Sequence, residues 1–387
     1  MFIHTYVIIT VSLLLISYCR SIHAGSIEPE QPPQYVRDIS HCSNNYNSPV
    51  RGRPTSIHDL HPGDIKAIAV IGDSISAGLA MENAQTECIT NASFIEYRGR
   101  SFDAGGDEGS ITLPNFINHY TSGKLIGSSI GQRPMPTCPD TFFCTEAPPL
   151  PSVDHFNAAI PSGTTKDMTK QINYLIPRIG KTSPLSNEWK VLTIELGQND
   201  LAISCFPDYN VVDFTARMTA GLKMIQENID YVFINLLSVS NSEEEVTITN
   251  DYPGYRKTFC DNPSFDIHDQ ECYCCHVPLG LGDTVIDANV ALFNLALQEI
   301  AVKFRPRGPD ATFGVLYQPF SLSIDSLPYT AISNLDGFHP NIHLHQFFAK
   351  SLWNQMFLPK HEKEHKLHYD ENLGIRCPGE DDRFETG

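Results

Sequence analysis

The side chains in this sequence that can perform acyl transfer stand in three short segments. Ser74 follows Gly-Asp at the end of an apolar run, and Asn199 stands in Gly-Gln-Asn-Asp after another. His339 follows Asp336 by three residues. A serine attacks an acyl carbon once a histidine takes its proton, a carboxylate fixes the tautomer of that histidine, and an amide stabilises the oxyanion. The residue types therefore predict a serine hydrolase site.

The spacing of Asp336 and His339 suits this chemistry. A tight turn ahead of a helix brings a carboxylate to Nδ1 of the ring and leaves Nε2 facing the serine. In such an arrangement the aspartate orients the imidazole and does not itself accept the proton. We therefore expect Ser74 as nucleophile, His339 as general base and Asp336 as its partner.

Four apolar runs, partly β-branched, are predicted as buried strands, at residues 65–71, 190–196, 231–238 and 312–317. Helical spacing of apolar residues separates or follows them, at residues 165–179, 212–229, 284–302 and 341–357. Strands that alternate with helices indicate parallel βαβ units and a three-layer α/β/α sandwich. The carboxyl ends of parallel strands meet at one edge of a sheet, so this fold brings the three segments together.

Two long stretches, roughly residues 98–160 and 241–282, are rich in Cys, Gly and Pro. They are too long for tight turns, and we expect loops or small excursions over the active face, stapled by disulfides. The sequence divides into a signal peptide, an extended lead-in, a hydrolase domain and a polar C-terminal tail, at residues 1–24, 25–60, 61–360 and 361–387.

The N-terminal segment predicts export from the cell. Residues 6–18 form an apolar run of signal-peptide length, with Ala24 as a small residue for cleavage. An uncleaved anchor helix is the alternative. Cleavage would remove Cys19 and leave ten cysteines, an even number that indicates disulfides whose connectivity the sequence does not fix. Asn91 stands in a sequon, Asn-Ala-Ser, and is a predicted glycosylation site of a secreted protein.

Composition excludes some classes of protein. The 387 residues, 41% of them hydrophobic, can bury a large core. With 27 Lys and Arg against 45 Asp and Glu, the net charge of -18 leaves no basic field for nucleic acid. The same charge disfavours electrostatic docking on an anionic bilayer, which leaves apolar contact as the route to lipid. The acidic end, residues 377–387, has no stop-transfer helix or lipid-anchor signal.

In their order along the chain, the three segments resemble those of the GDSL, or SGNH, hydrolases, whose fold is flavodoxin-like. Further segments resemble the phospholipase B branch of that superfamily, at residues 97–99, 105–107, 113–115, 156–160, 189–194, 318–320 and 352–354. The resemblance covers roughly residues 55–378. It implies the roles given above for Ser74, His339 and Asp336, Asn199 as the side-chain oxyanion donor, the Ser74 N–H as a second donor, and no metal or organic cofactor.

The sequence departs from the family pattern at three places. Ile75 replaces the usual Leu, which is a small change in volume. Gln198 stands where the phospholipase branch often has Gly, and we expect its added side chain to narrow the space near the oxyanion loop. The family's glycine oxyanion donor falls at Ser162 in an ungapped match, with Gly163 one position later. Either amide is therefore a candidate donor, although only glycine adopts a positive φ at little cost.

The same residues also allow interpretations other than a hydrolase. Ser74 alone is a common turn residue, and Asn199 alone a common Asx-turn residue. His361 to His365 matches the H-E-x-x-H of zinc peptidases, but Pro359 and three nearby lysines argue against a metal there. His343 and His345 are two residues apart, so they cannot lie on the same face of a helix and bind one metal ion. The cluster of Cys272, Cys274 and Cys275 with His276 fits disulfide bonds better than a zinc site.

The sequence thus predicts a secreted serine esterase that hydrolyses fatty-acyl esters of phospholipids and lysophospholipids. Its expected partners are the lipid substrate and, transiently, a membrane or micelle surface, with no nucleic acid; the sequence leaves the oligomeric state open. One alternative is a carboxylesterase for smaller or neutral esters. Comparing the release of short-chain and long-chain acyl groups would distinguish the two functions. The other is a secreted binding protein without catalysis, which would require a broken set of catalytic side chains.

Overall fold

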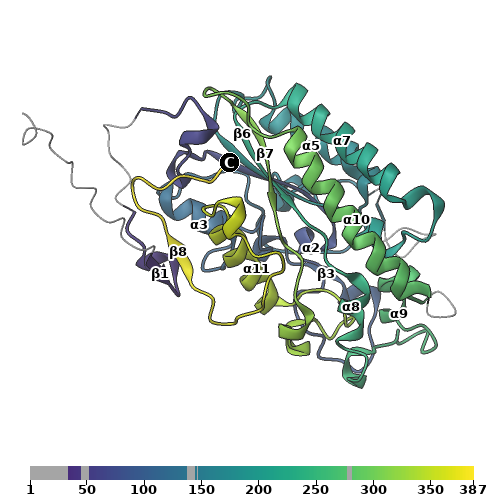
Figure 1. The fold of residues 1–387 in the computed structure, drawn as a ribbon. Coiled ribbons are helices and arrows are strands. Elements are labelled where there is room, and N and C mark those ends of the chain that lie inside the picture. Colours follow the sequence, from purple (N-terminus) through teal and green to yellow (C-terminus); the bar gives the residue numbers. More distant parts are fainter. Residues whose placement is uncertain (1–33, 45–51, 137–143, 146, 277–280) are drawn as a thin grey trace, which may run out of the picture. The chain divides into compact units, whose positions relative to one another are not determined.

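Four parallel strands form the central sheet of the computed structural model, in the order β2-β5-β6-β7 (Figure 1). They are β2 (Ala67–Gly72), β5 (Lys190–Glu195), β6 (Val232–Leu237) and β7 (Phe313–Gln318). Each lies within two residues of a strand predicted from its apolar run. Gly72 pairs with Glu195 in register, so β2 and β5 end side by side.

The structure describes residues 34–44, 52–136, 144–145, 147–276 and 281–387. Residues 35–387 belong to one compact unit. The predicted signal peptide, residues 1–24, and Cys138 lie outside the described residues.

Helices cover both faces of the sheet and make the fold a three-layer α/β sandwich (Figure 1). One face carries α5 (Met168–Ile179), α7 (Val211–Asn228) and α10 (Leu281–Lys303). The other face carries α3 (Leu113–Tyr120) and α11 (Ile342–Gln355). The short helices are α2 (Ser74–Ala77), α4 (Pro151–Asp154), α6 (Gln198–Ala202), α8 (Ser242–Thr247) and α9 (His268–Glu271).

The predicted helices form because their apolar residues recur on one face and polar residues cap their ends. Asn210 begins α7, with its side-chain oxygen accepting from the N–H groups of Val212 and Asp213. The sheet-facing side of that helix buries Phe214, Met218, Leu222 and Ile225. The predicted helices at 165–179, 212–229, 284–302 and 341–357 are thus found within three residues of their limits.

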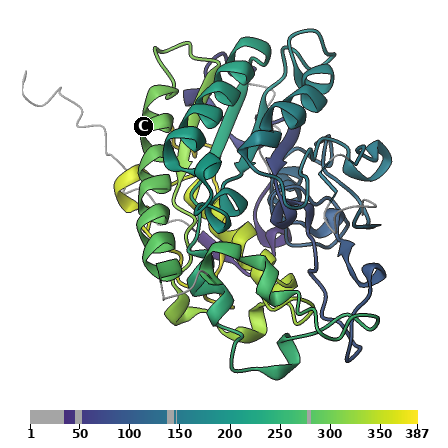
Figure 2. The same cartoon turned by 90° about the vertical axis from the view of Figure 1, so that its right-hand side faces the viewer.

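Helix α10 is long and apolar, and it forms the outer green helix at the left of Figure 2. Among the described residues, Thr284–Lys303 is one helix long and apolar enough to cross a membrane, with a mean hydropathy of 1.4. Its inner side packs Ile286, Phe293 and Leu297 into the core beneath the sheet. Core helices of soluble proteins pass the same test of length and hydropathy, so that test does not place α10 in a membrane.

The predicted excursion at residues 98–160 contains a helix that the sequence analysis did not predict. Helix α3 has only two turns, too few for a clear period, although Thr112 accepts from the N–H of Asn115 at its start. Its buried face packs Phe116 and Ile117 against the second side of the sheet. A small antiparallel sheet, β3 (Ile95–Glu96) with β4 (Arg133–Pro134), lies within or next to this stretch.

Disulfides staple the Cys-rich stretches, as the sequence predicted. The bonds among described residues are Cys42–Cys377, Cys88–Cys260, Cys205–Cys274 and Cys272–Cys275. Cys144 is disulfide-bonded as well. Three of the four bonds anchor residues 241–282, because a long segment with few apolar residues gains little order from packing alone.

Packing crosses the predicted domain limits at residues 60 and 360. Ile57 and Leu60 of the expected lead-in are fully buried. In the expected polar tail, Phe384 is buried, and its N–H donates to the Leu60 carbonyl. Strand β8 (Ile375–Cys377) pairs with β1 (Gln34–Val36). Single apolar residues among polar ones have no period, so this packing could not be predicted from the sequence.

Candidate active site

Ser74 lies where the central strand β2 ends. Asp73 caps the short helix α2, with Oδ1 accepting from the N–H of Ile75 at 2.9 Å. Ser74 is the first residue of that helix and is 6% exposed. Because a first-turn N–H has no acceptor within its own helix, the Ser74 N–H is free to meet a negative charge.

The structure brings Ser74, His339 and Asp336 into one hydrogen-bonded chain. The Nε2 atom of His339 lies 2.8 Å from the Ser74 Oγ, and its Nδ1 atom lies 2.7 Å from the Asp336 Oδ2. The other Asp336 oxygen accepts from the N–H groups of Phe338 and His339, both at 3.0 Å. A carboxylate fixed by its own turn thus fixes the ring, and the ring is in reach of the serine proton.

Gly337 makes the turn between Asp336 and His339 possible. Its φ is +74°, in the left-handed region, and a Cβ there would lie 2.7 Å from the Nδ1 of His268. Only glycine fits both conditions at little cost. The turn therefore depends on Gly337, which lies between Asp336 and His339 and was not among the predicted site residues.

The charges around His339 favour its protonated form. Burial alone would lower its pKa, but the charges of Asp336 and Glu271 outweigh burial and raise the pKa to about 9. Burial would likewise raise the pKa of Asp336, yet the neighbouring His339 and the turn's N–H groups lower it. The neutral ring that a general base requires is therefore favoured as pH rises.

Glu271 is a site residue that the sequence analysis missed. One oxygen of Glu271 lies within 4.8 Å of a ligand atom of Asp336 and of His339. Its Oε1 atom is buried with no hydrogen-bond partner, and burial raises the pKa of this carboxyl to about 8. The three side chains have the composition of a metal site, but both ring nitrogens of His339 are engaged by Asp336 and Ser74. Glu271 stands next to Cys272, and this neighbour is the one weak indication in the sequence that Glu271 lies near the site.

Asn199 lies on α6, where strand β5 ends beside β2. Gly197 caps this helix with φ +130°, and a Cβ there would meet Val239 at 2.8 Å. The Asn199 Nδ2 atom donates to the Asp73 Oδ2 at 3.2 Å and to the Gly163 carbonyl at 3.0 Å. Both hydrogens of the Asn199 amide are therefore used in hydrogen bonds. To donate to an oxyanion, the amide must first break its bond to Asp73 or to Gly163. The longer bond to Asp73 is the weaker of the two.

Ser162 and Gly163 occupy a type II turn. The Gly163 N–H donates to the Ile160 carbonyl at 2.8 Å, Pro161 holds the first central position, and Ser162 has φ +60°. The Gly163 N–H is thus used by the turn itself. Among the described residues the Ser162 N–H donates to no acceptor, which favours Ser162 as the backbone oxyanion donor of the two.

Three buried carboxyl groups, those of Asp73, Asp103 and Glu195, lie close to Ser74. Ser76 donates to Asp103 at 2.7 Å and approaches Glu195 at 3.2 Å, while the Asp73 N–H donates weakly to Glu195. Burial raises the pKa of Asp73 to about 6, that of Asp103 to about 7, and that of Glu195 well above its usual value. No lysine or arginine in the described parts of the chain forms an ion pair with them, so no such cation offsets the rise that burial gives to their pKa values.

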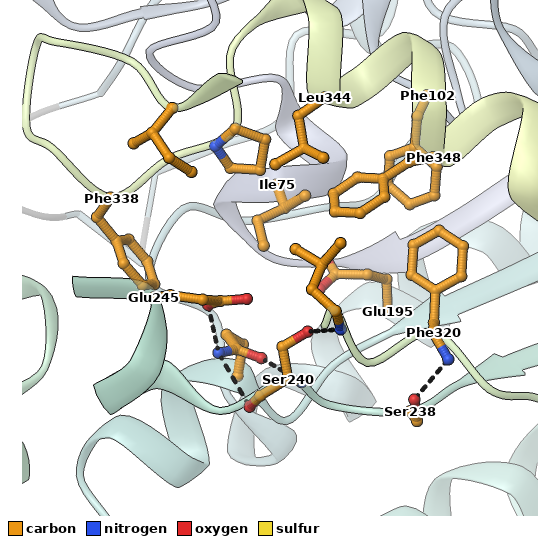
Figure 3. A pocket seen from close by; sticks show the side chains of 14 residues that line it. Ile75, Phe102, Glu195, Ser238, Ser240, Glu245, Phe320, Phe338, Leu344 and Phe348 are labelled. Carbon is orange, nitrogen blue, oxygen red and sulfur yellow. Dashed lines mark hydrogen bonds between the residues drawn. The ribbon is translucent and has the colours of Figure 1, made fainter. Parts of the chain in front are cut away.

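A pocket of about 30 Å³ lies beside the predicted nucleophile (Figure 3). Ile75, next to Ser74, lines it, and so do Phe338 and Pro340 on either side of His339. In Figure 3 the rings of Phe102, Phe320 and Phe348 form one side, and Glu245 lies on the other side with Phe338. The further lining residues are Phe102, Glu195, Gln198, Ser238, Phe320, Leu322, Ile332, Leu344 and Phe348.

The structure does not assemble the alternative metal sites. A 3-10 turn covers Lys360–Glu362 only, so His361 and His365 are not one helical turn apart. His345 is buried and accepts from the Phe102 N–H, whereas His343 is exposed on another face. The clustered cysteines are in disulfides. Asn91 is exposed at the start of a 3-10 turn, where a glycan can reach it.

Comparison with known proteins identifies one family and several relatives. A family described as GDSL-like lipase/acylhydrolase matches residues 68–352. Phospholipase B1, membrane-associated, of Homo sapiens is 26% identical over 383 residues, covering 95% of this chain and 24% of that protein. The protein of that name in Rattus norvegicus is 26% identical over 348 residues, covering 86% of this chain and 22% of that protein. The chain spans about a quarter of the length of the curated relatives it matches.

Proposed function

Because the chain belongs to the GDSL-like lipase/acylhydrolase family, we propose that it is an ester hydrolase in which Ser74, His339 and Asp336 form the catalytic triad. The observation that carries this proposal is the continuous chain from the Ser74 Oγ through both ring nitrogens to the Asp336 carboxylate, at 2.8 and 2.7 Å. Family membership supports the reaction class, and the geometry supports the choice of residues.

The reaction has two halves. The Ser74 Oγ attacks the acyl carbon while the His339 Nε2 takes the hydroxyl proton, and the carbonyl oxygen becomes an oxyanion. The oxyanion lies near the N–H of Ser74, the N–H of Ser162 and the Asn199 amide. Collapse of this intermediate expels the alcohol, which takes the proton back from His339. Water then attacks the acyl-enzyme in the same way and releases the carboxylic acid.

The proposed substrates are acyl esters of phospholipids and lysophospholipids. This part rests on the family, whose description includes lipases, and on relatives named phospholipase B1. The disulfides indicate an extracellular or secretory-pathway protein. We propose that the protein is secreted after removal of residues 1–24 and carries a glycan on Asn91. Lipid contact is then transient, at a membrane or micelle surface.

One observation favours a second candidate function, the hydrolysis of smaller or neutral esters. The pocket beside Ser74 has a volume of about 30 Å³, which holds one or two water-sized groups and not a long acyl chain. A long chain would have to lie outside this pocket or displace its walls.

A fluorophosphonate probe tests the proposed mechanism. We expect the probe to label Ser74, as mapped by mass spectrometry, and Ser74→Ala to lose both labelling and ester hydrolysis. Ser76→Ala is a matched control, because Ser76 is a buried serine of the same helix whose hydroxyl bonds to Asp103 and not to His339. Labelling at another residue, or full hydrolysis by Ser74→Ala, would refute the triad. Assays on phosphatidylcholine, lysophosphatidylcholine and simple carboxylic esters then separate the two candidate functions.

A further inference from the structure

Gln198 is held rigidly in the wall of the pocket beside Ser74. Its Nε2 atom donates to the Glu245 Oε2 at 3.2 Å and approaches the Ser240 carbonyl at 3.4 Å. Its Oε1 atom accepts from the Ser240 N–H at 3.1 Å. The side chains of Gln198 and Glu245 are both buried. Because both ends of the amide are bonded, Gln198 cannot rotate out of the pocket without leaving buried groups unpaired.

The pocket's position suits the acyl part of an ester. Its lining residue Ile75 follows the nucleophile, Gln198 precedes the oxyanion donor Asn199, and Phe338 precedes His339. An acyl carbon bonded to the Ser74 Oγ, with its oxygen toward Asn199, therefore has this partly apolar space next to it. Opposite the Gln198–Glu245 pair, Phe102, Phe320 and Phe348 pack against one another with ring centroids 4.9 to 5.6 Å apart. Neither wall leaves room for a long chain.

We propose that this pocket is the acyl subsite and that Gln198, braced by Glu245 and Ser240, limits it to short acyl groups. The inference rests on the proposed function, since it requires an acyl group on Ser74, and it favours the second candidate function over the hydrolysis of long-chain esters. It names the acyl part of the substrate and leaves the alcohol part free.

The test compares hydrolysis of p-nitrophenyl butyrate and p-nitrophenyl octanoate, both below their micellar concentrations. For the unchanged protein we expect kcat/KM to be at least about ten-fold higher for butyrate, because methylenes that do not fit a pocket cost about ten-fold or more. Gln198→Gly opens the wall and should raise the octanoate-to-butyrate ratio by about ten-fold. Gln198→Leu keeps the side-chain volume but loses the hydrogen bonds, so its ratio should stay near that of the unchanged protein.

Each outcome decides the inference. Equal hydrolysis of the two esters by the unchanged protein would overturn it, and so would an unchanged ratio in a folded Gln198→Gly protein. A similar rise in Gln198→Leu would show that lost hydrogen bonds, not volume, set the preference, and would also overturn it. If Gln198→Gly does not fold, Phe348→Ala opens the opposite wall and must raise the ratio instead. Full hydrolysis by Ser74→Ala would contradict the proposed function itself, whereas a Ser74-dependent reaction with an unmoved ratio contradicts only the acyl subsite.

Discussion

His339 bonds to Ser74 and Asp336, and Glu271 lies within reach of its charge. Negative charge beside an imidazole favours the protonated ring, so hydrolysis should rise with pH well above the ordinary histidine pKa of 6.5. Glu271→Gln removes one source of that charge and should move the acid limb of the kcat/KM profile to lower pH. The measurement is the pH profile on a soluble ester.

Glu244→Gln is the control for Glu271→Gln. Glu244 belongs to the same Cys-rich region but pairs with Lys366 at 3.7 Å, away from the imidazole. Its pH profile should match that of the unchanged protein. A Glu271→Gln profile that does not move would show that Asp336 alone sets the pKa of His339.

Ser162 carries a left-handed backbone at the proposed oxyanion turn. Ser162→Gly keeps the N–H and removes a conformational cost of about 1 kcal/mol, so we expect higher stability with hydrolysis retained. Gly163→Ala should lower both, because its Cβ would lie 2.7 Å from the Ile160 carbonyl. Urea unfolding and kcat on a soluble ester measure the two effects. Loss of hydrolysis in a stable Ser162→Gly protein would contradict this account of the turn.

Residues close to a motif were predictable, and residues far from it were not. Ser74, Asn199 and His339 each stand in a short recognisable run just after a strand or before a helix. Glu271 and Glu245 reach the site from the long region 241–282, which has no apolar period and is positioned by disulfides of unpredictable connectivity. The sequence also left Ser162 and Gly163 undecided, because only the turn's hydrogen bond distinguishes their amides.

At the scale of elements, Arg98 connects the start of the long stretch 98–160 to Ala159, just before the proposed oxyanion turn at Ser162. It is fully buried, pairs with Glu96 at 2.5 Å and Asp154 at 3.2 Å, and donates to the Ala159 carbonyl at 2.8 Å. Arg98→Met leaves buried carboxylates without their full complement of cations and should cost about 3–5 kcal/mol of stability. Arg100→Met, whose pair with Glu82 is partly exposed, should cost less than about 1 kcal/mol.

Chemical denaturation of the two arginine variants checks this prediction. Similar losses in both would show that Arg98 acts as a surface residue. We also expect Arg98→Met to lose hydrolysis, because its guanidinium holds the chain just before the Ser162 turn.

Long periodic elements were predictable here, namely the four strands and four of the flanking helices. The two-turn α3 and the buried ionic contacts were not, since neither leaves a period in the sequence.

At the scale of the whole molecule, buried acids govern the response to pH. Burial raises the pKa of Asp73 to about 6, of Asp103 to about 7 and of Glu245 to about 8, and that of Glu195 is also raised. In the unfolded chain these groups ionise near 4, so between pH 4 and 8 the folded protein holds more protons. Stability must then fall as pH rises through that window.

The raised pKa of His339 acts in the same direction, since its contribution to stability is lost as pH rises toward 9. We therefore expect a higher melting temperature at pH 5 than at pH 8.5, measured by calorimetry. Hydrolysis and stability should thus have opposite pH trends. A melting temperature that rises from pH 5 to 8.5 would contradict the protonated state of the buried acids.

The Cys42–Cys377 bond closes a covalent loop 335 residues long, with β1 and β8 beside it. Under tension applied to the chain on either side of this bond, the load passes directly between the two sulfur atoms. Once Phe384 has been pulled from its contact with Phe233, the central sheet, the proposed triad and the proposed acyl pocket lie inside the loop and carry none of that force. With the disulfide intact, the protein pulled by its two ends should therefore extend only by the residues outside the loop. Reduction of the bond would expose the residues inside the loop to unfolding by force.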